Sequence, residues 1–341
     1  MKAWVINRIC DLKKEDRPLT LCDIPKPKQK NGELLLKVRS CGICHTEIDE
    51  IEGRTAPPIY PIVPGHQVVG IVEESKAKNG TINVGDRVGV AWIFSTCGTC
   101  EFCQSGQENL CPNFLATGRD QNGGYAEYMT VPEGFVYPIP DFFSDAEAAP
   151  LLCAGAIGFR SLQLCQPKNG QHIGLTGFGA SAHLVLKLVR HLYPNSKTYV
   201  FARSKKEQAF ALELGAVWSG DTSDRPPILL HSIIDTTPVW KPVVHAMECL
   251  KPGGRLVINA IRKEHLDQDY LTKLDYPIHL WMEKEIKSVA NVTRHDVKEF
   301  IGIATEMQFK PDIQTYPFEA ANRAIMDIKN RNIKGAKVLM L

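Results

Sequence analysis

Short apolar runs broken by turn residues make up the chain as far as about residue 150. The runs over 33–38, 68–72 and 87–90 are rich in Val, Leu and Ile, and turns such as Val84-Gly85-Asp86 separate them. Short β-prone runs with turn signals at such close intervals are typical of strands. The pattern therefore predicts an irregular, β-barrel-like domain.

From about residue 171, strand-like and helix-like segments alternate. Strands are predicted over 172–175, 198–201, 232–235 and 255–258, with helices over 182–192 and 205–214. This alternation predicts a parallel sheet covered by helices, so the fold class is α/β. Beyond about residue 290 we expect one more helix, over 296–305, and a final strand over 336–340.

The composition is that of a folded protein with two domains. The chain has 341 residues, and domains of roughly 150 residues make two the expected number. A hydrophobic content of 44% and a charged content of 23% exclude a disordered, collagen-like or coiled-coil chain. The net charge of +2 draws the chain neither to nucleic acid nor to an anionic membrane. Neither nucleic acid nor a membrane is therefore an expected partner.

The cysteines are the main indication of function. Because the N-terminus lacks the apolar core of a signal peptide and no run of about 18 apolar residues is present, a cytoplasmic location is expected. Thiols stay reduced there, and clustered cysteines bind metals more often than one another. The chain has eleven cysteines, an odd number that excludes complete internal pairing.

Four of these cysteines lie close together, at Cys97, Cys100, Cys103 and Cys111. A tetrahedral zinc ion takes four soft ligands, and C-x2-C turns place two thiolates on one ion. Because the protein fills all four positions, the predicted site is structural and has no room for substrate. Ordinary buried or disulfide-bonded cysteines are the alternative interpretation. A zinc-ribbon nucleic-acid module is another, but the neighbouring residues are acidic rather than basic.

Three further candidate ligands, Cys44, His66 and Cys153, are far apart in the sequence. Cys44 begins a Cys-His-Thr segment, His66 follows Gly65, and Cys153 precedes an Ala-Gly pair. Sequence spacing does not bring the three together, and each one taken alone is better explained as a core residue.

The order of these motifs resembles that of the zinc-dependent alcohol dehydrogenases of the medium-chain dehydrogenase/reductase family. The resemblance extends along essentially the whole chain, and the cinnamyl-type and bacterial broad-range enzymes are the most similar branch. It rests on the Cys-His-Thr loop at 44–46, Gly65-His66, Gly-Asp-Arg-Val at 85–88, the four cysteines, the run 123–128, Cys-Ala-Gly at 153–155 and the nucleotide fold that follows.

The resemblance implies how the chain is divided. A GroES-like catalytic domain is expected over 1–152, with a structural zinc lobe at about 95–113 and a return of the chain over 289–341. A Rossmann nucleotide-binding domain is expected over 153–288. The resemblance also implies a homo-oligomer, either a dimer or a tetramer.

On the same resemblance, Cys44, His66 and Cys153 bind a catalytic zinc, which makes two zinc ions per chain. Two thiolates and one imidazole leave a fourth position for water or alcohol. Zinc there acts as a Lewis acid that lowers the pKa of the bound hydroxyl, and hydride then leaves to a nicotinamide. Thr46 falls where the family places the hydroxyl that takes the substrate proton, and His45 falls among the cofactor contacts.

The resemblance also places Trp92 at the substrate pocket, and Ile48 is a candidate for its apolar wall; an ordinary core position is the alternative for both. An apolar cleft suits primary or aromatic alcohols and their aldehydes better than polyols. The expected reaction is therefore the interconversion of such alcohols and aldehydes. A polyol or sugar dehydrogenase of the same family and a catalytically idle zinc-binding protein are the alternatives.

Three positions near these ligands depart from the family pattern. Gln67 stands where the family often has Glu, and Glu47 stands where Asp is common, so its carboxylate reaches one methylene farther. Asp49 stands where many relatives have a histidine that passes the proton to solvent, which leaves the proton route beyond Thr46 open. Changes of residues around the metal ligands can alter the affinity for the metal, or the activity, by about 10–100-fold.

A glycine-rich turn lies between the first predicted strand and helix of the parallel sheet. Dinucleotide folds use glycines there for a tight turn, for close approach to the pyrophosphate and for helix packing. In the register that the family resemblance implies, the glycines are Gly174, Gly177 and Gly179. An alternative register of the motif uses Gly177, Gly179 and Ala182. The residues expected to contact the cofactor are Gly174, Thr176, Gly177, Phe178 and Gly179.

The end of the second predicted strand bears on cofactor choice. An NAD site places Asp or Glu there to accept from the ribose 2′-OH, but this chain has Ala202 followed by Arg203, Ser204 and Lys205. A guanidinium matches the geometry of a 2′-phosphate. We therefore favour NADP(H), with NAD(H) as the alternative. A solvated basic run at a helix start is the other interpretation of these residues.

Overall fold

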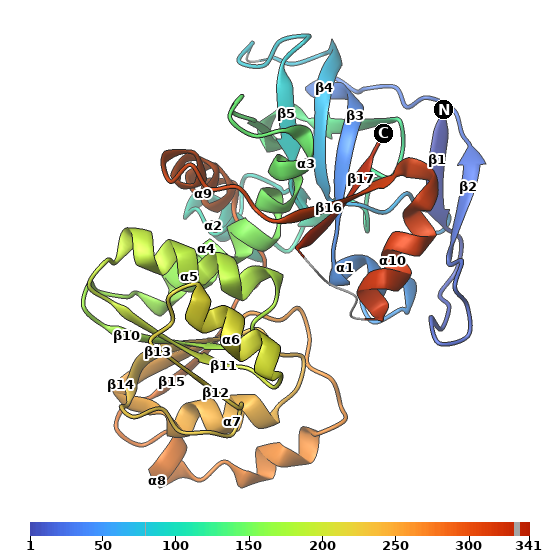
Figure 1. Cartoon of the computed structure of the whole chain (residues 1–341). Coiled ribbons are helices and arrows are strands. Elements are labelled where there is room, and N and C mark those ends of the chain that lie inside the picture. Colours follow the sequence, from blue (N-terminus) through green and yellow to red (C-terminus); the bar gives the residue numbers. More distant parts are fainter. Residues whose placement is uncertain (79, 331–334) are drawn as a thin grey trace. The chain divides into compact units, whose positions relative to one another are not determined.

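The computed structural model describes residues 1–78, 80–330 and 335–341. They form two compact units (Figure 1). Met1–Ala156 and Asn291–Leu341 make up the first, which we call the barrel unit. Ile157–Ala290 makes up the second, which we call the parallel-sheet unit.

The barrel unit contains a seven-stranded sheet, and its strands come from both ends of the chain. Six of them follow the order β16 (Ile313–Pro317), β17 (Ala336–Met340), β3 (Glu33–Ile43), β4 (Gln67–Ser75), β5 (Arg87–Val90) and β9 (Val136–Pro138), and β8 (Tyr128–Pro132) pairs with β3. β16 and β17 are parallel, whereas the other neighbours are antiparallel. β3 is the longest strand, and most of its side chains are buried.

Shorter elements complete this unit. Two small antiparallel sheets pair β1 (Lys2–Ile6) with β2 (Leu19–Asp23) and β6 (Ile93–Ser95) with β7 (Leu115–Ala116). The α-helices are α1 (His45–Ile51), α2 (Glu101–Gln104), α3 (Asp145–Ala148), α9 (Arg294–Glu306) and α10 (Ala321–Lys329). The 3-10 turns are η1 (Glu108–Leu110), η2 (Glu133–Phe135), η3 (Ala149–Leu152) and η5 (Phe318–Ala320).

The parallel-sheet unit has six strands, all parallel to their neighbours. Their order is β12 (Trp218–Gly220), β11 (Lys197–Phe201), β10 (His172–Thr176), β13 (Leu230–Asp235), β14 (Leu250–Ile258) and β15 (Glu285–Ser288). The helices α5 (Ala180–Leu192) and α6 (Lys205–Glu213) cover one face in Figure 1, and α7 (Lys241–Glu248) covers the other. The order reverses direction at β10, as in a doubly wound Rossmann sheet. The predicted α/β fold class is confirmed.

Every predicted strand and helix named above is present, but the pattern missed several elements. The helix α4 (Ala154–Cys165), the helices α7 and α10, and the strand β16 were not predicted. β14 also begins five residues earlier than expected, at Leu250, because a Lys-Pro-Gly-Gly segment that looks like a turn lies within it. Only Leu250 and the residues from Arg255 onward pair with β13, so the turn-like segment stays as an irregularity within the strand.

One helical stretch, Asp145–Cys165, is long and apolar enough by composition to cross a membrane. However, 67% of that window is buried inside the protein. Such burial is usual for a core helix of a folded domain.

Candidate active site

The three candidate ligands that are distant in sequence meet in the barrel unit. Their ligand atoms all lie within 4.8 Å of one another. Cys44 Sγ is 3.7 Å from His66 Nε2, which is 3.3 Å from Cys153 Sγ. The imidazole is almost fully buried, whereas the two thiols are partly exposed. The structure therefore brings together residues whose sequence spacing did not require it.

Strand pairing explains the meeting of the first two ligands. β3 and β4 are antiparallel, and Gly42 on β3 is the register partner of Gln67 on β4. Cys44 follows the end of β3 at the start of α1, and His66 directly precedes β4. Antiparallel pairing places the end of one strand beside the start of the next. Cys153 arrives separately, at the end of η3, which packs against β3, β4 and β5.

The donor set and its spacing fit a zinc ion. In tetrahedral geometry, Zn–S bonds near 2.3 Å and Zn–N bonds near 2.0–2.1 Å place the ligand atoms about 3.5–3.8 Å apart. The Sγ–Nε2 distances of 3.7 and 3.3 Å are close to that spacing. Three protein donors leave a tetrahedral ion with one position for a small molecule. The cluster therefore fits an open, catalytic type of metal centre.

Glu47 links two of the candidate ligands. Its Oε1 lies 2.7 Å from His66 Nδ1, and its Oε2 accepts a hydrogen bond of 2.7 Å from the backbone N–H of Cys44. Glu47 is the third residue of α1, and Cys44 is the N-cap, so the second contact is half of a capping box. A carboxylate at Nδ1 places the imidazole proton there and leaves Nε2 to face the sulfurs.

The electrostatics of this cluster favour a positive charge beside the imidazole. Burial alone lowers the pKa of His66, but the Glu47 carboxylate and Cys44 outweigh burial and raise that pKa well above its usual value. The same field that favours a proton on the ring favours a cation at Nε2. The sequence identified Glu47 only as a departure from the family pattern and missed its contact with His66. Its position three residues after Cys44 was the available signal.

Gly65 sets the approach of His66. Its φ of +98° lies in the left-handed region, and a Cβ there would lie 2.3 Å from the Tyr125 ring. A side chain at this position would meet both strain and a steric clash. The Gly-His pair is therefore a structural requirement of the site, which the motif alone did not explain.

The other residues expected around the ligands lie on α1 or near β6. Thr46 donates its backbone N–H to Cys44 Sγ at 3.4 Å, and His45 is exposed. Ile48 is 1% exposed, so its side chain is part of the core of the barrel unit. Asp49 is also buried, and its Oδ1 accepts a 2.5 Å hydrogen bond from Arg54 Nε. That ion pair holds the carboxylate that occupies the family's relay position.

Trp92 lies just before β6, in an aromatic and cationic environment. Its ring is 5.3 Å from that of Phe114 and 5.5 Å from the Arg119 guanidinium. The side chain is only partly buried. Its role at the substrate pocket stays a prediction.

The four clustered cysteines form a second potential metal centre. Their sulfur atoms all lie within 4.8 Å of one another, with Sγ–Sγ distances of 3.5 to 3.9 Å, and none is in a disulfide. Backbone N–H groups of Thr99 and Cys100 point at Cys97 Sγ and lower its pKa to about 5. A lowered pKa supplies the thiolate that a metal needs. Four protein donors complete a tetrahedron, so this centre fits a closed, structural type.

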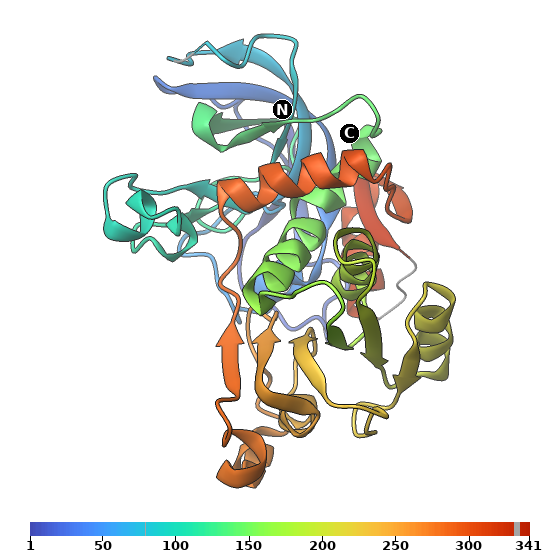
Figure 2. The ribbon, with the colours of Figure 1, turned by 90° about the vertical axis from the view of Figure 1, so that its left-hand side faces the viewer.

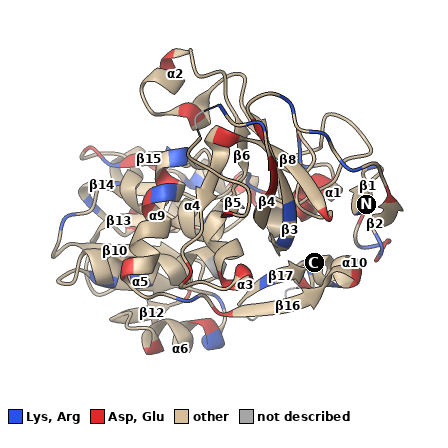
Figure 3. Cartoon of the chain, turned by 90° about the horizontal axis from the view of Figure 1, so that it is seen from above, with Lys and Arg blue, Asp and Glu red and all other residues tan. Residues whose placement is uncertain are grey.

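This lobe extends away from the sheet of the barrel unit (Figure 2). Its short helix α2 shows only acidic and uncharged residues in Figure 3. Glu108 in η1 ties the lobe to the start of α9, because its carboxylate accepts from Arg294 at 2.8 and 3.0 Å. This partly buried pair joins segments 186 residues apart in the chain.

The predicted glycine loop follows β10 in the parallel-sheet unit. Gly177 has a φ of +79°, and a Cβ there would lie 2.7 Å from Thr236 Oγ1. Gly179 is the N-cap of α5 and provides no capping side chain, so the first N–H groups of that helix can bind an anion. Phe178 is buried and packs its ring 5.8 Å from Phe210. Thr176 is also buried.

The two registers of the glycine motif place different residues in the turn. Gly174 lies inside β10, where a Cβ would meet Ile233, whereas Ala182 is fully buried on α5. Gly177 and Gly179 belong to both registers and lie in the turn itself.

The end of β11 carries no carboxylate. Ala202 is buried, and its carbonyl accepts from Gln208 Nε2 at 2.7 Å. Arg203 is exposed, while Ser204 caps α6 by accepting from the N–H of Glu207. Lys205 Nζ donates to Gln208 Oε1 at 3.0 Å. Of the three residues expected to contact the cofactor here, Arg203 is therefore the one whose side chain is most available to a ligand.

Comparison with known proteins agrees with this geometry. Residues 30–141 match the alcohol dehydrogenase GroES-like domain. The chain therefore has the fold and the candidate metal centres of a zinc-type alcohol dehydrogenase, and it belongs to the medium-chain dehydrogenase/reductase family of these enzymes.

Individual relatives match along the whole chain. It is 39% identical to the probable alcohol dehydrogenase AdhA of Mycobacterium tuberculosis, over 100% of this chain and 97% of that protein. It is 31% identical to an alcohol dehydrogenase of Geobacillus stearothermophilus, over 100% and 99% of the two chains. A cinnamyl alcohol dehydrogenase from Sorghum bicolor superposes with a TM-score of 0.85 at 26% identity, covering 99% of this chain and 97% of that one.

The resemblance inferred from the motifs is therefore confirmed. The protein is an NAD(P)-dependent alcohol oxidoreductase that interconverts alcohols and aldehydes. The expected enzyme class and reaction are confirmed.

Replacing Glu47 tests its part in the centre. Glu47→Gln keeps the shape but removes the charge beside His66, so we expect zinc retention against a chelator and kcat/KM both to fall by about 10–100-fold. Zinc content after dialysis and steady-state kinetics measure the two effects. Glu73→Gln, a carboxylate on β4 that pairs with Lys26, is the matched control and should change neither. Normal zinc retention by Glu47→Gln would contradict this role.

Proposed function

We propose that this enzyme is a two-zinc alcohol dehydrogenase and aldehyde reductase whose reaction centre is Cys44, His66 and Cys153. The observation that carries the proposal is the convergence of these three ligand atoms within 4.8 Å. Cys97, Cys100, Cys103 and Cys111 hold the second, structural zinc. The spacing of each group supports one ion per group.

The chain's own residues position the reaction. When bound at the open centre, a zinc ion would supply Lewis acidity to the oxygen of the alcohol or carbonyl, and a bound nicotinamide would accept or supply the hydride. Glu47 holds His66 by its Nδ1, so the ring presents Nε2. Thr46 follows Cys44 by two residues, and its hydroxyl accepts the proton of the alcohol and passes its own proton on to solvent as the C–H hydride departs. In the reductive direction both proton transfers run in reverse.

We propose primary alcohols, including aromatic ones, as the substrates. The partly buried Trp92, with Phe114 against it, supports an apolar wall of the substrate pocket. Apolar walls favour substrates with few hydroxyl groups. The assignment of Ile48 to this wall has weaker support, because its side chain is buried. A polyol or sugar dehydrogenase remains the second candidate, since the family includes such enzymes.

NADP(H) is the proposed cofactor. The exposed Arg203 beyond β11, together with the absence of a carboxylate there, supports a contact with a 2′-phosphate. The loop from Gly174 to Gly179 binds the pyrophosphate through the start of α5. Exposed His45 is proposed as a further cofactor contact.

We also propose a homo-oligomer, a dimer or a tetramer, in the cytoplasm. The edge strand β15 is exposed along its whole length, and Ile278, Trp281 and Met282 beside it are exposed apolar residues. An unpaired strand edge with apolar neighbours is a surface that another chain can cover. Free cysteines in both candidate centres support a reducing compartment.

Cofactor consumption on a panel of substrates tests the reaction centre. We expect turnover with benzyl alcohol and benzaldehyde, less with ethanol and least with sorbitol.

Cys153→Ala should abolish turnover and remove one of two zinc ions, because the four-cysteine lobe keeps its own ion. Cys22→Ala, a cysteine outside both groups, is the control and should keep both ions and full activity. Sorbitol as the best substrate would favour the polyol dehydrogenase. One zinc per chain without any turnover would favour the idle zinc-binding protein.

Kinetics with both cofactors test the preference. We expect higher kcat/KM with NADPH, and Arg203→Ala should lower it by about tenfold, because a charge-assisted hydrogen bond is lost. The value with NADH should barely change. Lys206→Ala, at an exposed position three residues later in the chain, is the control. A kcat/KM at least about tenfold better with NADH in the native enzyme would contradict the proposal.

Sedimentation equilibrium tests the assembly. We expect the mass of a dimer or tetramer of the 38.0 kDa chain. Ile286→Lys on the β15 edge should shift the mass towards the monomer, because a charge at a paired edge opposes association. Lys287→Glu keeps a charge at the next position and serves as the control. A native protein that sediments as a monomer would contradict this part of the proposal.

A further inference from the structure

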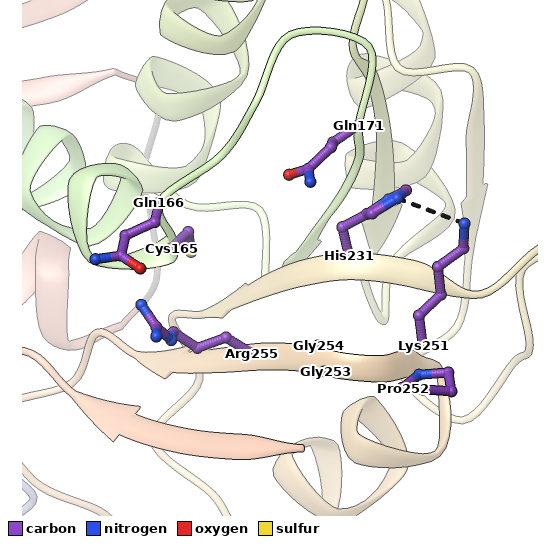
Figure 4. A pocket seen from close by; sticks show the side chains of 9 residues that line it. All are labelled: Cys165, Gln166, Gln171, His231, Lys251, Pro252, Gly253, Gly254 and Arg255. Carbon is purple, nitrogen blue, oxygen red and sulfur yellow. Dashed lines mark hydrogen bonds between the residues drawn. The ribbon is translucent and has the colours of Figure 1, made fainter. Parts of the chain in front are cut away.

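A pocket of about 160 Å³ lies in the parallel-sheet unit, away from the glycine loop. Gln171, just before β10, His231 on β13 and Lys251 on β14 line one part of it, and Arg255 and the end of α4 line another (Figure 4). These residues lie towards the amino-terminal ends of the strands. Dinucleotides bind at the carboxyl ends, where Gly177 follows β10. The pocket is therefore distinct from the cofactor site.

An irregularity between β13 and β14 creates this pocket. Leu230 pairs with Leu250, but the next register pair is Ser232 with Arg255. Four residues of β14, from Lys251 to Gly254, thus lie opposite the single residue His231. The extra residues bulge out of the ladder and carry Lys251 alongside the imidazole.

Hydrogen bonding defines which atoms of His231 are donors. The backbone N–H of His172 donates to His231 Nδ1 at 3.0 Å. A backbone N–H can only donate, so Nδ1 is the acceptor and the ring proton is on Nε2. Burial, with the charge of Lys251 and the neighbouring His172, lowers the pKa of His231, which keeps the ring neutral.

Two donors therefore face each other. Lys251 Nζ lies 3.4 Å from His231 Nε2, and an ammonium group has no acceptor. An N–H and an NH₃⁺ at this distance cannot satisfy one another, so both need an acceptor from a third group. Figure 4 shows the two side chains converging on the same side of the pocket.

The remaining lining residues add donors and no carboxylate. The amides of Gln166 and Gln171 and the guanidinium of Arg255 belong to the lining. Arg255 is held from behind by Glu285, with hydrogen bonds of 2.9 and 3.0 Å, and by the Leu164 carbonyl at 2.8 Å. Its position is thus fixed, while the charge of Lys251 faces the pocket with the imidazole.

We propose that this pocket binds a small oxyanion, best matched by a phosphate group, with Lys251 Nζ and His231 Nε2–H holding its oxygens. The volume of about 160 Å³ leaves room for a phosphate and some water. A tetrahedral anion accepts several hydrogen bonds at once, which suits two donors that lie 3.4 Å apart. Such binding stabilises the parallel-sheet unit by linkage.

NMR of the full-length enzyme labelled with ¹⁵N-histidine tests this site. The protein is first saturated with NADPH, so that added inorganic phosphate cannot report on the cofactor site. The His231 resonances are identified by their loss in His231→Gln. We expect phosphate to shift the His231 Nε2 signal saturably. No saturable shift of His231 would overturn the proposal.

Matched variants assign the effect to Lys251. Lys251→Met keeps the aliphatic stem but removes the charge, and it should weaken the apparent Kd for phosphate by about tenfold or more. Lys197→Met removes a lysine at the start of the neighbouring β11 that does not line the pocket, and it should leave Kd unchanged. Equal weakening by both variants would show a general charge effect and overturn the site. Acetate shifting His231 as strongly as phosphate would overturn the preference for a phosphate group.

Discussion

The contact between the Glu47 carboxylate and His66 is the interaction on which the candidate reaction centre depends. Both groups are excluded from water, at 0% and 1% exposure, so solvent does not screen their attraction. The same carboxylate caps α1 through the N–H of Cys44. One side chain thus links the start of a helix, a ligand on that helix and a ligand before the adjacent strand. A metal centre needs this type of support, because ligands free to rotate hold a metal less tightly.

The barrel sheet provides the frame for that contact. The pairing of Gly42 with Gln67 places Cys44 and His66 beside each other, where β3 ends and β4 begins. A register shift of one residue would turn the side chains of β4 to the opposite faces. Cys153 is independent of this register, since η3 brings it from another part of the chain. The three ligands therefore reach the same point by two separate routes, two of them through strand pairing and the third through the packing of η3.

The parallel sheet has a candidate anion site at each of its two ends. At the carboxyl ends, Gly177 and Gly179 leave backbone N–H groups at the start of α5, which suits a pyrophosphate. At the amino ends, the bulge in β14 brings a lysine beside a histidine whose proton faces it. The first site uses backbone groups and a helix dipole, and the second uses side chains. Only the first is expected from the fold class.

Local patterns in the sequence by themselves determined much of the secondary structure and one of the two cysteine clusters. Apolar periodicity and turn residues predicted central strands of both units, among them β3, β4 and β5 of the barrel sheet and β10, β11, β13 and β14 of the parallel sheet, because these signals act within a few residues. The spacing of Cys97, Cys100, Cys103 and Cys111 predicted their cluster for the same reason. The tertiary structure decided the rest. It placed His66 between two sulfurs, turned Glu47 towards its ring, and opposed His231 with Lys251 across a strand irregularity. These contacts join residues far apart in the chain, and only strand register and packing specify which of them meet.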